Sequence, residues 1–527
     1  MDKLLSTGAA GHIYEMLRKA GHEVWFVGGC VRDAMLGIEP HDADLCTDAS
    51  PEQMRAIFAK KKIKTIDFGA PYGTIGVIPE VSKVEKTIQR VDGVETRNND
   101  PLYGIMAAIK NGRIVDITSF RSDGAYTDGR RPDKVALGAT LEQDLARRDF
   151  TVNAMAWNPE AGLVDPYGGR QDLEQRFIRA VGDPAKRFAE DALRMMRAIR
   201  FAAKLGFDIE KKTSAAIYAF SKRIKNVSME RIREELSGII TSPNPRAVRM
   251  VYKSGLYRYF LDELKYLFDP EYNRQNSPYH LYDVGGHTVR AMECSTNSLL
   301  VRMTLLLHDV GKPLVRTINK RGFDSFHGHE EASAEMAGQI LARLRFPKEF
   351  IRRAALLIRM NDRGLKPERP AVKRFLRKLG ADNLDDFYEI ARADALAHAP
   401  DAAKRTLVDL DAAYEIAKDV LSSGETYELS GLEINGRDAA ALGYAGPGIG
   451  AILERCLERV ICDPGENTRE KLIRFMGHEN PSVASGDTSL FLPQSAPLTA
   501  PSQAKGPRER RETAALLSPL LKGDVTQ

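Results

Sequence analysis

Long hydrophobic runs are missing from this sequence, and cysteines are few. No stretch approaches about 18 uncharged apolar residues, so we expect no membrane-spanning helix and no membrane partner. The first residues contain no apolar segment followed by a small-residue cleavage site, which argues against a signal peptide. The five cysteines are scattered and never form a Cys-x-x-Cys pair, so neither a disulfide framework nor a cysteine-rich zinc site is expected. These absences favour a cytoplasmic protein.

A strong excess of one charge is also missing. The 77 Lys and Arg against 72 Asp and Glu give a net charge of +5. This balance excludes a uniformly basic protein that coats nucleic acid, but it allows a local basic face. The hydrophobic fraction of 43% and charged fraction of 28% are ordinary for globular proteins. A length of 527 residues predicts three or four domains at about 150 residues each.

The hydrophobic pattern changes along the chain. Period-two and apolar runs predict strands at 23–27, 73–78 and 114–120, mixed with helices in roughly the first 150 residues. From about Asp172 to Met476 the pattern is almost wholly helical. After that point Ser, Pro, Thr, Ala and Gly dominate, which predicts a disordered C-terminal segment.

Two glycines, Gly28 and Gly29, separate an expected strand from a helix that starts near Val31. Backbone N–H groups at such a turn can approach an anion at the helix N-terminus. Arg32, one turn inside the helix, can reach the same anion. Most Gly-Gly pairs are only tight turns, so this motif by itself is weak.

Three aspartates suggest a metal site. Asp42 and Asp44 are two residues apart, so in a strand both carboxylates point to one face. They repel each other unless a cation lies between them, and their hard oxygen ligands suit Mg²⁺. Asp116 lies in another strand-like run and can approach from an adjacent strand. Such a set suits phosphoryl transfer, although a polar turn and an exposed strand acid remain alternatives.

The segment at 147–149 offers groups that can bind a nucleotide. Arg147 and Arg148 provide donors for phosphate, and Asp149 can accept a hydrogen bond from a ribose hydroxyl. The alternative interpretation of this segment is a charged loop that enters a strand at 154–157.

A set of charged residues at intervals of three predicts one slowly winding stripe on a helix. Its members are Asp191, Arg194, Arg197 and Arg200. Cytosine and adenine present an amino donor beside a ring-nitrogen acceptor, whereas guanine and uracil present the reverse. An Asp–Arg pair can therefore accept C and A and refuse G and U without a template. The alternative is a solvated charged face.

In combination these segments resemble the class II tRNA nucleotidyltransferases, the CCA-adding enzymes. The resemblance covers residues 20–476 and rests on the order and spacing of Gly28-Gly29-x-x-Arg32-Asp33, Asp42-x-Asp44, Arg147-Arg148-Asp149-Phe-Thr-x-Asn-Ala and Glu190-Asp191-x-x-Arg194. It implies stepwise addition of C, C and A from CTP and ATP to the 3′ end of tRNA, with release of pyrophosphate. The implied partner is the acceptor stem and 3′ end of tRNA, and no protein partner is implied.

The resemblance also implies roles for individual residues. Asp42 and Asp44 would bind Mg²⁺, with Asp116 as the third catalytic acid. The triphosphate and ribose would contact Gly28, Gly29, Arg32, Arg148 and Asp149. The base would be read by Asp191 and Arg194, with Arg197 and Arg200 nearby. The family's mobile loop corresponds to residues 122–133, and residues 79–112 are longer than the short hairpin expected before the third acid.

The fold class implied is an α+β nucleotidyltransferase head followed by mainly α-helical domains. The expected division is a head at 1–160, a helical neck and body at 161–275, an HD domain at 276–400, a helical tRNA-binding tail at 401–477 and a disordered segment at 478–527. Residues 230–236 resemble the family's neck-to-body helix. Residues 446–450 are expected to form a turn before a helix at Ala451.

A second group of residues follows the H…HD…D order of HD phosphohydrolases. Its members are His287, His308, Asp309 and Asp394, a donor set that suits a divalent transition metal. His308 and Asp309 are expected near the end of a helix that stops at Gly311. His327 and His329 offer further ligands, whereas Asn361 stands where many two-metal HD sites have His. We expect at most one weakly held metal, and both a hydrolase and a domain that only contacts RNA remain open.

Three alternatives to CCA addition remain at this point. The chain is compatible with a poly(A) polymerase, with a CC-only or A-only adding enzyme, or with an HD phosphohydrolase whose head only binds RNA. The loop at 122–133 favours full CCA addition. Asp42, Asp44, Arg148 and Asp191 argue against a non-catalytic head.

Overall fold

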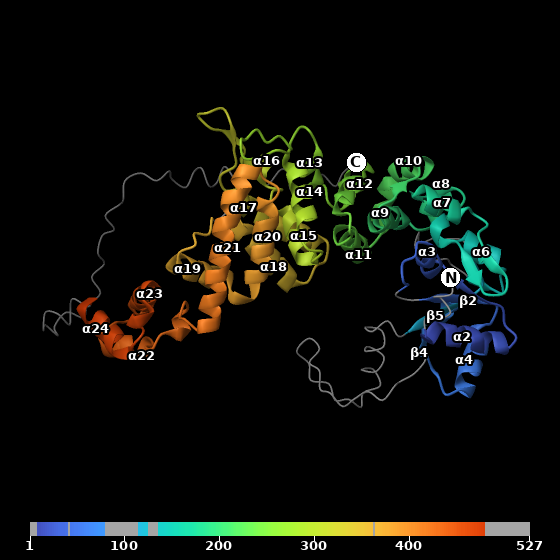
Figure 1. Ribbon diagram of the computed structural model, residues 1–527, viewed down its shortest axis with the longest axis horizontal. Coiled ribbons are helices and arrows are strands. Elements are labelled where there is room, and N and C mark those ends of the chain that lie inside the picture. Colours follow the sequence, from blue (N-terminus) through green and yellow to red (C-terminus); the bar gives the residue numbers. More distant parts are fainter. Residues whose placement is uncertain (1–7, 41–42, 79–113, 125–134, 362–363, 480–527) are drawn as a thin grey trace. The chain divides into compact units, whose positions relative to one another are not determined.

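The computed structural model describes residues 8–40, 43–78, 114–124, 135–361 and 364–479 (Figure 1). Contacts divide the chain into two compact units, with the boundary between Glu425 and Thr426. Several predictions lie outside the described residues: those for Asp42, for the segment 79–112, for most of the loop at 122–133 and for the C-terminal segment from residue 480.

A seven-stranded mixed sheet forms the centre of the amino-terminal part, in the order β3-β4-β5-β2-β1-β8-β9. Its strands are β1 (Val24–Val27), β2 (Asp44–Thr47), β3 (Lys64–Gly69), β4 (Thr74–Ile78), β5 (Val115–Ser119), β8 (Ala156–Asn158) and β9 (Gly162–Val164). Strands β2 and β5 are parallel, and the other neighbours are antiparallel. The strands expected at 23–27, 73–78 and 114–120 are confirmed.

The strand β1 is an unbroken apolar run because both of its faces are covered. On one face Phe26 stacks on Tyr14 of α2 (Gly8–Lys19), with ring centroids 5.6 Å apart. On the other face Trp25 packs against Leu145 of α6 (Leu141–Ala146). All four residues of the strand are buried, which fixes the end of β1 that leads into the Gly28–Gly29 turn.

Shorter elements surround the sheet. They are α3 (Gly29–Met35), α4 (Pro51–Lys60) and the hairpin of β6 (Arg121–Asp123) and β7 (Val135–Leu137). Helix α3 begins at Gly29, two residues earlier than expected. Residues Thr151–Asn153 form a 3-10 turn, so the strand expected at 154–157 begins only at Ala156.

The rest of the first unit is mainly helical, as expected. Its helices are α7 (Gly169–Gln175), α8 (Pro184–Glu190), α9 (Arg194–Leu205), α10 (Lys211–Phe220), α11 (Met229–Ile240), α12 (Val248–Lys253), α13 (Leu264–Phe268), α14 (Val284–Cys294), α15 (Leu299–Leu307), α16 (Lys312–Val315), α17 (His329–Arg343), α18 (Lys348–Asn361), α19 (Arg369–Leu379), α20 (Leu384–Ala395) and α21 (Pro400–Ser423). Two short strand pairs interrupt them: β10 (Phe177–Ile178) with β11 (Asp208–Ile209), and β12 (Thr317–Ile318) with β13 (Asp324–Ser325).

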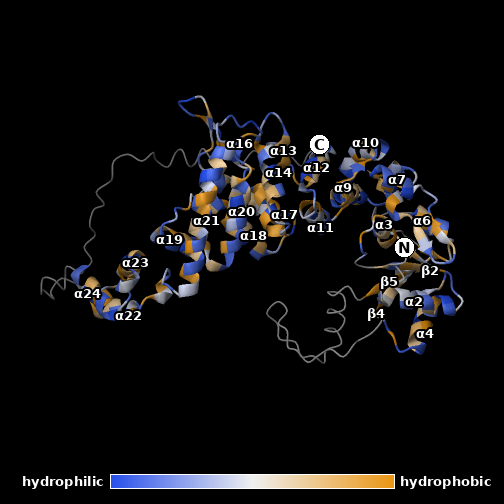
Figure 2. Ribbon diagram, viewed as in Figure 1, coloured by the Kyte–Doolittle hydropathy of each residue, from blue (hydrophilic) through white to orange (hydrophobic). Residues whose placement is uncertain are grey.

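These helices are amphipathic, and Figure 2 shows hydrophilic and hydrophobic residues along them. In α9, Met196 and Ile199 are fully buried, as the three-and-four spacing predicts. Helix α9 packs against α11 and ends at Gly206, whose φ of 67° is a left-handed cap. Of the helices in the described part of the chain, none is long and apolar enough to cross a membrane.

The second unit contains α22 (Gly436–Ala441), α23 (Pro447–Cys462) and α24 (Arg469–Glu479) around a small core that includes Cys456 and Leu457. The turn expected at 446–450 is wrong, because α23 already begins at Pro447. Gly446 has a φ of 51° and precedes a proline at the first helical position, a combination that starts a helix there. The tail was expected from residue 401, whereas α21 packs on α19 and α20 within the first unit.

Candidate active site and candidate metal centre

A cleft of about 590 Å³ lies within the first unit, between the sheet and the helices α9 and α11. It gathers side chains from segments that are far apart in sequence. Of the residues expected to bind nucleotide or metal in the head, it is lined by Gly28, Gly29, Arg32, Asp44, Asp116, Arg148, Asp149, Asp191, Arg194 and Arg197. The structure therefore brings together most of the described candidates, and Arg200 is the exception.

Two acids lie side by side at one end of adjacent strands. The parallel strands β2 and β5 pair Leu45 with Ile117, so continuing this register by one residue places Asp44 beside Asp116. Both residues are exposed and both line the cleft. Neighbouring carboxylates repel each other in the absence of a cation. The donor set of this pair therefore fits a divalent metal such as Mg²⁺.

The backbone conformation and the available space both require glycine at position 28, directly before α3. Gly28 has φ 74° and ψ −127°, a conformation that residues with a side chain rarely adopt. A Cβ atom built on Gly28 would lie 2.9 Å from a terminal nitrogen of Arg148. The turn therefore leaves room for the Arg148 guanidinium in the cleft.

The arginine of the same motif lines the cleft but is held by contacts within the protein. Arg32 is only 3% exposed and donates to Oδ1 of Asn153 at 2.6 Å and to Oδ1 of Asp33 at 2.8 Å. Its guanidinium also lies 5.3 Å from the centre of the Phe201 ring. These contacts fix Arg32 between α3, the 3-10 turn and α9, so its expected contact with the triphosphate stays a prediction.

A buried carboxylate fixes the two adjacent arginines. Asp144 is fully buried; its Oδ1 accepts from Arg147 at 2.5 and 3.1 Å, and its Oδ2 accepts from Arg148 at 3.0 and 3.3 Å. Burial opposes ionisation of Asp144, but the two guanidiniums outweigh it and lower the pKa. The sequence analysis missed Asp144, although its spacing of three and four residues from the two arginines places it on their side of a helix.

We expect Asp144→Asn to lower the free energy of unfolding by about 3 kcal/mol, because it removes one partner of a buried ion pair and leaves the other. Urea unfolding followed by circular dichroism measures this change. Glu142→Gln on the same helix is the matched control, because Glu142 is exposed. Equal stability of the two variants would contradict the proposal that the ion pairs of Asp144 with Arg147 and Arg148 stabilise the fold.

The carboxylate of Asp149 is already engaged within the protein. Its Oδ2 accepts from Arg197 at 2.6 and 2.8 Å, and its Oδ1 accepts from the Phe150 N–H and the Asn153 amide. Burial raises the pKa of Asp149, but Arg197 and the hydrogen bonds outweigh it and lower the pKa to about 2. Asp149 is therefore ionised in the cleft, and its expected contact with a ribose stays a prediction that requires Arg197 to share the carboxylate.

The stripe expected from Asp191 to Arg200 is wrong as a single helical face. Asp191 lies between α8 and α9 with extended backbone (φ −143°, ψ 110°), and α9 begins only at Arg194. The reason is local: the Asp191 carboxylate accepts from the Leu193 N–H at 3.0 Å, which stabilises a break between the helices.

Each member of the expected stripe has a different partner. Arg194 donates to Glu190 at 2.5 Å and to the carbonyl oxygen of Arg147 at 3.1 Å. Arg200 donates to Glu235 at 2.6 Å and does not line the cleft. Asp191 pairs with Arg231 at 2.7 Å, and both of these residues line the cleft. The sequence analysis missed the roles of Arg231 and Glu235, because it treated their helix only as a connection between domains.

The cleft is also lined by a buried cysteine, Cys30, that we expect to be unreactive. The Cys30 thiol is buried and donates to the carbonyl oxygen of Val27 at 3.3 Å. Burial and the nearby charge of Asp44 raise its pKa to about 12. At pH 8 roughly one thiol in ten thousand would then be the reactive thiolate. We expect iodoacetamide to modify the exposed Cys462 and to spare Cys30, as measured by peptide mass spectrometry; equal rates would contradict this.

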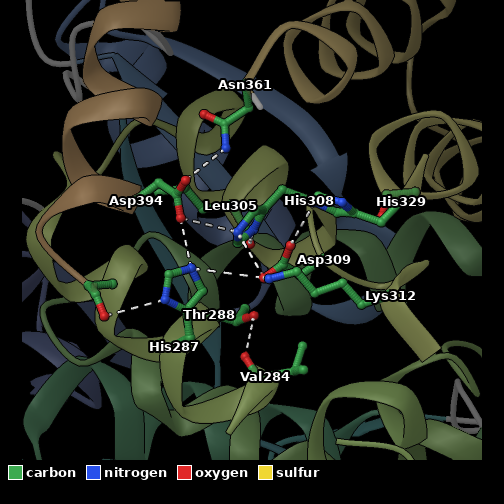
Figure 3. Close-up of polar contacts among 12 residues, drawn as sticks. Val284, His287, Thr288, Leu305, His308, Asp309, Lys312, His329, Asn361 and Asp394 are labelled. Carbon is green, nitrogen blue, oxygen red and sulfur yellow. Dashed lines mark hydrogen bonds and ion pairs between the residues drawn. The ribbon is translucent and has the colours of Figure 1, made fainter. Parts of the chain in front are cut away.

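The second candidate site lies in the helical part of the first unit (Figure 3). The Nε2 atom of His287 on α14 lies 2.7 Å from Oδ1 of Asp394 on α20. The Nε2 atom of His308 lies 3.3 Å from Oδ2 of Asp309 and 3.4 Å from Oδ1 of Asp394. All four residues line a pocket of about 320 Å³, so the structure brings the H…HD…D residues together. Helix α15 ends at Leu307 rather than Gly311, which places His308 and Asp309 at the turn that follows it.

Further polar groups surround these four residues. Lys312 lies 2.8 Å from Oδ2 of Asp309, and His329 lies 3.5 Å from its Oδ1. Asn361, which the sequence analysis singled out, donates to Oδ2 of Asp394 at 3.0 Å. Asn361 therefore orients a candidate ligand in this structure, and His327 also lines the pocket.

The buried acceptors in this pocket fit a metal ion. Nδ1 of His308 contacts the Leu305 carbonyl oxygen at 2.6 Å, which directs Nε2 into the pocket. Nε2 of His308 and Oδ2 of Asp309 are buried, and their contacts among the described residues are ion pairs: Oδ2 lies 2.8 Å from Lys312 and 3.3 Å from Nε2 of His308. Ligand atoms of His287, His308 and Asp309 lie within 4.8 Å of one another. Imidazole and carboxylate groups are the ligand types that divalent transition metals prefer, so this cluster fits a bound cation.

Two histidines near this centre were not predicted. His280 and His398 lie beside His287, with ring centroids 5.1 and 4.8 Å from its ring. His280 precedes α14 and His398 follows α20, so no helical spacing links them to the motif residues. The signal available in the sequence was only their position close to His287 and Asp394.

Three segments of the chain match known protein families. Residues 24–104 and 96–179 match the poly A polymerase head domain. Residues 206–268 match the family described as a probable RNA and SrmB-binding site of polymerase A, and residues 279–398 match the HD domain.

Curated relatives are similar to part of the chain. A CCA-adding enzyme of Lactobacillus helveticus (strain DPC 4571) is 40% identical over 240 residues, which are 46% of this chain and 51% of the relative. A CCA-adding enzyme of Geobacillus thermodenitrificans (strain NG80-2) is 38% identical over 248 residues, which are 47% of this chain and 53% of the relative. The chain thus spans about half the length of the curated relatives it matches.

Solved structures share the fold over most of the chain. The crystal structure of Bacillus stearothermophilus CCA-adding enzyme in complex with CTP has a TM-score of 0.62 at 24% identity, covering 91% of this chain and 98% of that one. A structure of a CCA-adding enzyme with CTP has a TM-score of 0.51 at 20% identity, covering 90% of this chain and 94% of that one. At these identities the likeness concerns the fold alone, and it agrees with the expected head and helical remainder.

Proposed function

We propose that this chain, which belongs to the class II tRNA nucleotidyltransferase family, adds C, C and A to the 3′ end of tRNA. The substrates are CTP and ATP, and pyrophosphate is released. The observation that carries the proposal is the cleft, where Asp44, Asp116 and Arg148 of the head meet Asp191. Two acids that can hold a metal, an arginine that can donate hydrogen bonds to phosphate and a carboxylate that can accept from a base amino group thus line one cavity. The curated relatives named CCA-adding enzymes support the same activity.

The acidic residues of the cleft would hold Mg²⁺. Asp44 and Asp116 lie in register on adjacent strands, and the sequence adds Asp42 to this set. Mg²⁺ bound there would neutralise charge on the triphosphate and favour attack of the tRNA 3′-OH on the α-phosphate. Nucleotidyltransferase domains and HD domains generally use divalent metals.

The basic residues of the cleft would bind the triphosphate. Arg148 is oriented by Asp144 and lies over Gly28, so its guanidinium can bind phosphate without a large loss of side-chain freedom. Arg32 supports the same wall through Asn153. The neck, which contains the match to an RNA-binding site at 206–268, would contact tRNA.

The proposal is tested with a tRNA transcript that lacks CCA, incubated with each nucleoside triphosphate alone and with mixtures. Addition of two C from CTP alone, followed by one A when ATP is present, supports CCA addition. Runs of A indicate a poly(A) polymerase, and addition that stops at CC or requires a CC end indicates a partial enzyme. Absence of any addition contradicts the proposed function of the head.

We propose a phosphohydrolase activity for the HD residues as a second candidate function. The observation that favours it is the cluster of His287, His308 and Asp309, whose ligand atoms lie within 4.8 Å of one another and fit a divalent transition metal. The test is hydrolysis of 2′,3′-cyclic nucleotides with and without Ni²⁺ or Mn²⁺, by wild type and His308→Ala. Asp44→Ala is the control, because its defect lies in the head. Hydrolysis that persists in His308→Ala contradicts the proposal.

A further inference from the structure

We propose that Arg231 of α11 is a positioning residue for base selection, which holds the Asp191 carboxylate in the orientation that accepts the amino group of C or A. This inference rests on the proposed function and names a specificity-determining residue for it. Arg231 lies 40 positions after Asp191 in the chain. It belongs to α11, whereas Asp191 lies between α8 and α9.

The contact between Arg231 and Asp191 is bidentate, with one guanidinium nitrogen near each carboxylate oxygen. Nη2 of Arg231 donates to Oδ2 of Asp191 at 2.7 Å, and Nη1 approaches Oδ1 at 3.4 Å. The same Oδ1 accepts from the Leu193 N–H at 3.0 Å. The side chains of Asp191 and Arg231 are 13% and 22% exposed, and both line the cleft. The carboxylate is therefore held on both oxygens while part of it still faces the cleft.

The backbone of Asp191 explains why an outside partner is needed. Asp191 lies in the extended break between α8 and α9, so neither helix restrains its side chain through helical packing. The arginines that follow it have other partners: Arg194 pairs with Glu190, and Arg197 pairs with Asp149. Among the described residues, the Leu193 N–H holds Oδ1 of this carboxylate, and the ion pair with Arg231 is the contact that holds Oδ2.

Base selection by a carboxylate requires an ionised group with a fixed direction. A guanidinium that binds both oxygens limits rotation of the carboxylate, because bidentate pairs have a defined geometry. Without Arg231, the Asp191 carboxylate can rotate and lose its alignment with the amino group. Uracil and guanine make no such hydrogen bond, so their addition should change less than that of cytosine and adenine.

The test is addition of single nucleotides to a tRNA transcript by Arg231→Gln and Arg231→Lys, with each nucleoside triphosphate measured separately. We expect Arg231→Gln to lower the preference in kcat/KM for CTP over UTP about tenfold, which corresponds to about 1.4 kcal/mol. Arg231→Lys should recover part of this preference, because lysine keeps the positive charge but lacks the guanidinium that contacts both carboxylate oxygens. An equal loss with all four nucleotides, or an unchanged preference, would overturn the inference.

The matched control is Arg233→Gln on the same helix. Arg233 contacts the carbonyl oxygen of Arg345 and the ring of Phe346, and it does not line the cleft. We expect this variant to keep the wild-type preference. A melting temperature measured for each variant separates a loss of folding from a loss of selection, because a purely structural defect lowers addition of every nucleotide alike.

A double-mutant cycle shows whether Arg231 acts through Asp191. In an Asp191→Ala background, Arg231→Gln should cause no further loss of preference, and additive losses would overturn the inference. Failure of the two proposals is distinguishable. Wild-type protein that adds no nucleotide overturns the proposed function and this inference with it. Wild-type addition together with an unchanged preference in Arg231→Gln overturns the inference alone.

Discussion

Asp44→Ala is expected to reduce nucleotide addition by about a thousandfold or more while leaving the protein folded. Asp44 is exposed and lies in register beside Asp116, so its loss removes a candidate metal ligand while the buried core of the sheet stays unchanged. Loss of several kcal/mol of transition-state stabilisation gives a decrease of this size, at about tenfold for each 1.36 kcal/mol. Asp42→Ala is expected to behave in the same way. The measurement is single-turnover addition of C to a tRNA transcript at a moderate Mg²⁺ concentration.

Binding of tRNA and the melting temperature distinguish this defect from a general one. Both should remain close to wild type in Asp44→Ala, because the RNA-binding match and the helical core lie elsewhere. Asp67→Ala is the matched control, since Asp67 is an exposed acid on β3 of the same sheet that pairs with Arg55 and does not line the cleft. Addition at the wild-type rate by Asp44→Ala would contradict the assignment of the metal site.

The elements that hold the candidate active site could be predicted from local patterns. The apolar run of β1 reads as a buried strand because both of its faces are covered, and the amphipathic spacing of α9 is preserved in the structure. The proximity of Asp44 and Asp116 is harder to predict from the sequence. It depends on the parallel pairing of β2 with β5, strands that are separated by about 70 residues, and no local rule determines that pairing.

The partners of the charged residues could not be predicted for a related reason. A spacing of three residues indicates one helical face only if the helix is continuous, and the break at Asp191 removes that condition. The carboxylate then pairs with Arg231, a residue on α11 that no short-range pattern connects to it. The HD residues show the opposite case. Their motif order predicted that they lie together, and they line one pocket, whereas His280 and His398 join them from the segments before α14 and after α20.

The choice of base should depend most strongly on Asp191. Replacing Asp191 with alanine removes the acceptor for the amino group of C and A and the negative charge that repels the carbonyl oxygens of U and G. Arg194 would remain as a donor able to contact those carbonyl oxygens. A good bidentate contact is worth roughly 1–3 kcal/mol of discrimination. We therefore expect addition of U or G, relative to C or A, to rise by roughly 10- to 100-fold over wild type.

The measurement is addition of a single nucleotide to a tRNA that ends at the discriminator base, with each nucleoside triphosphate tested separately. Arg194→Ala should lose rate with all four nucleotides more than it loses preference, because a donor can serve every base. Asp183→Ala is the control: Asp183 is exposed and caps α8, so its loss affects the helix rather than the cleft. If Asp191→Ala slows every nucleotide equally and keeps the preference for C and A, then Asp191 does not read the base. Its pairing with Arg231 would in that case only hold the break between α8 and α9 against α11.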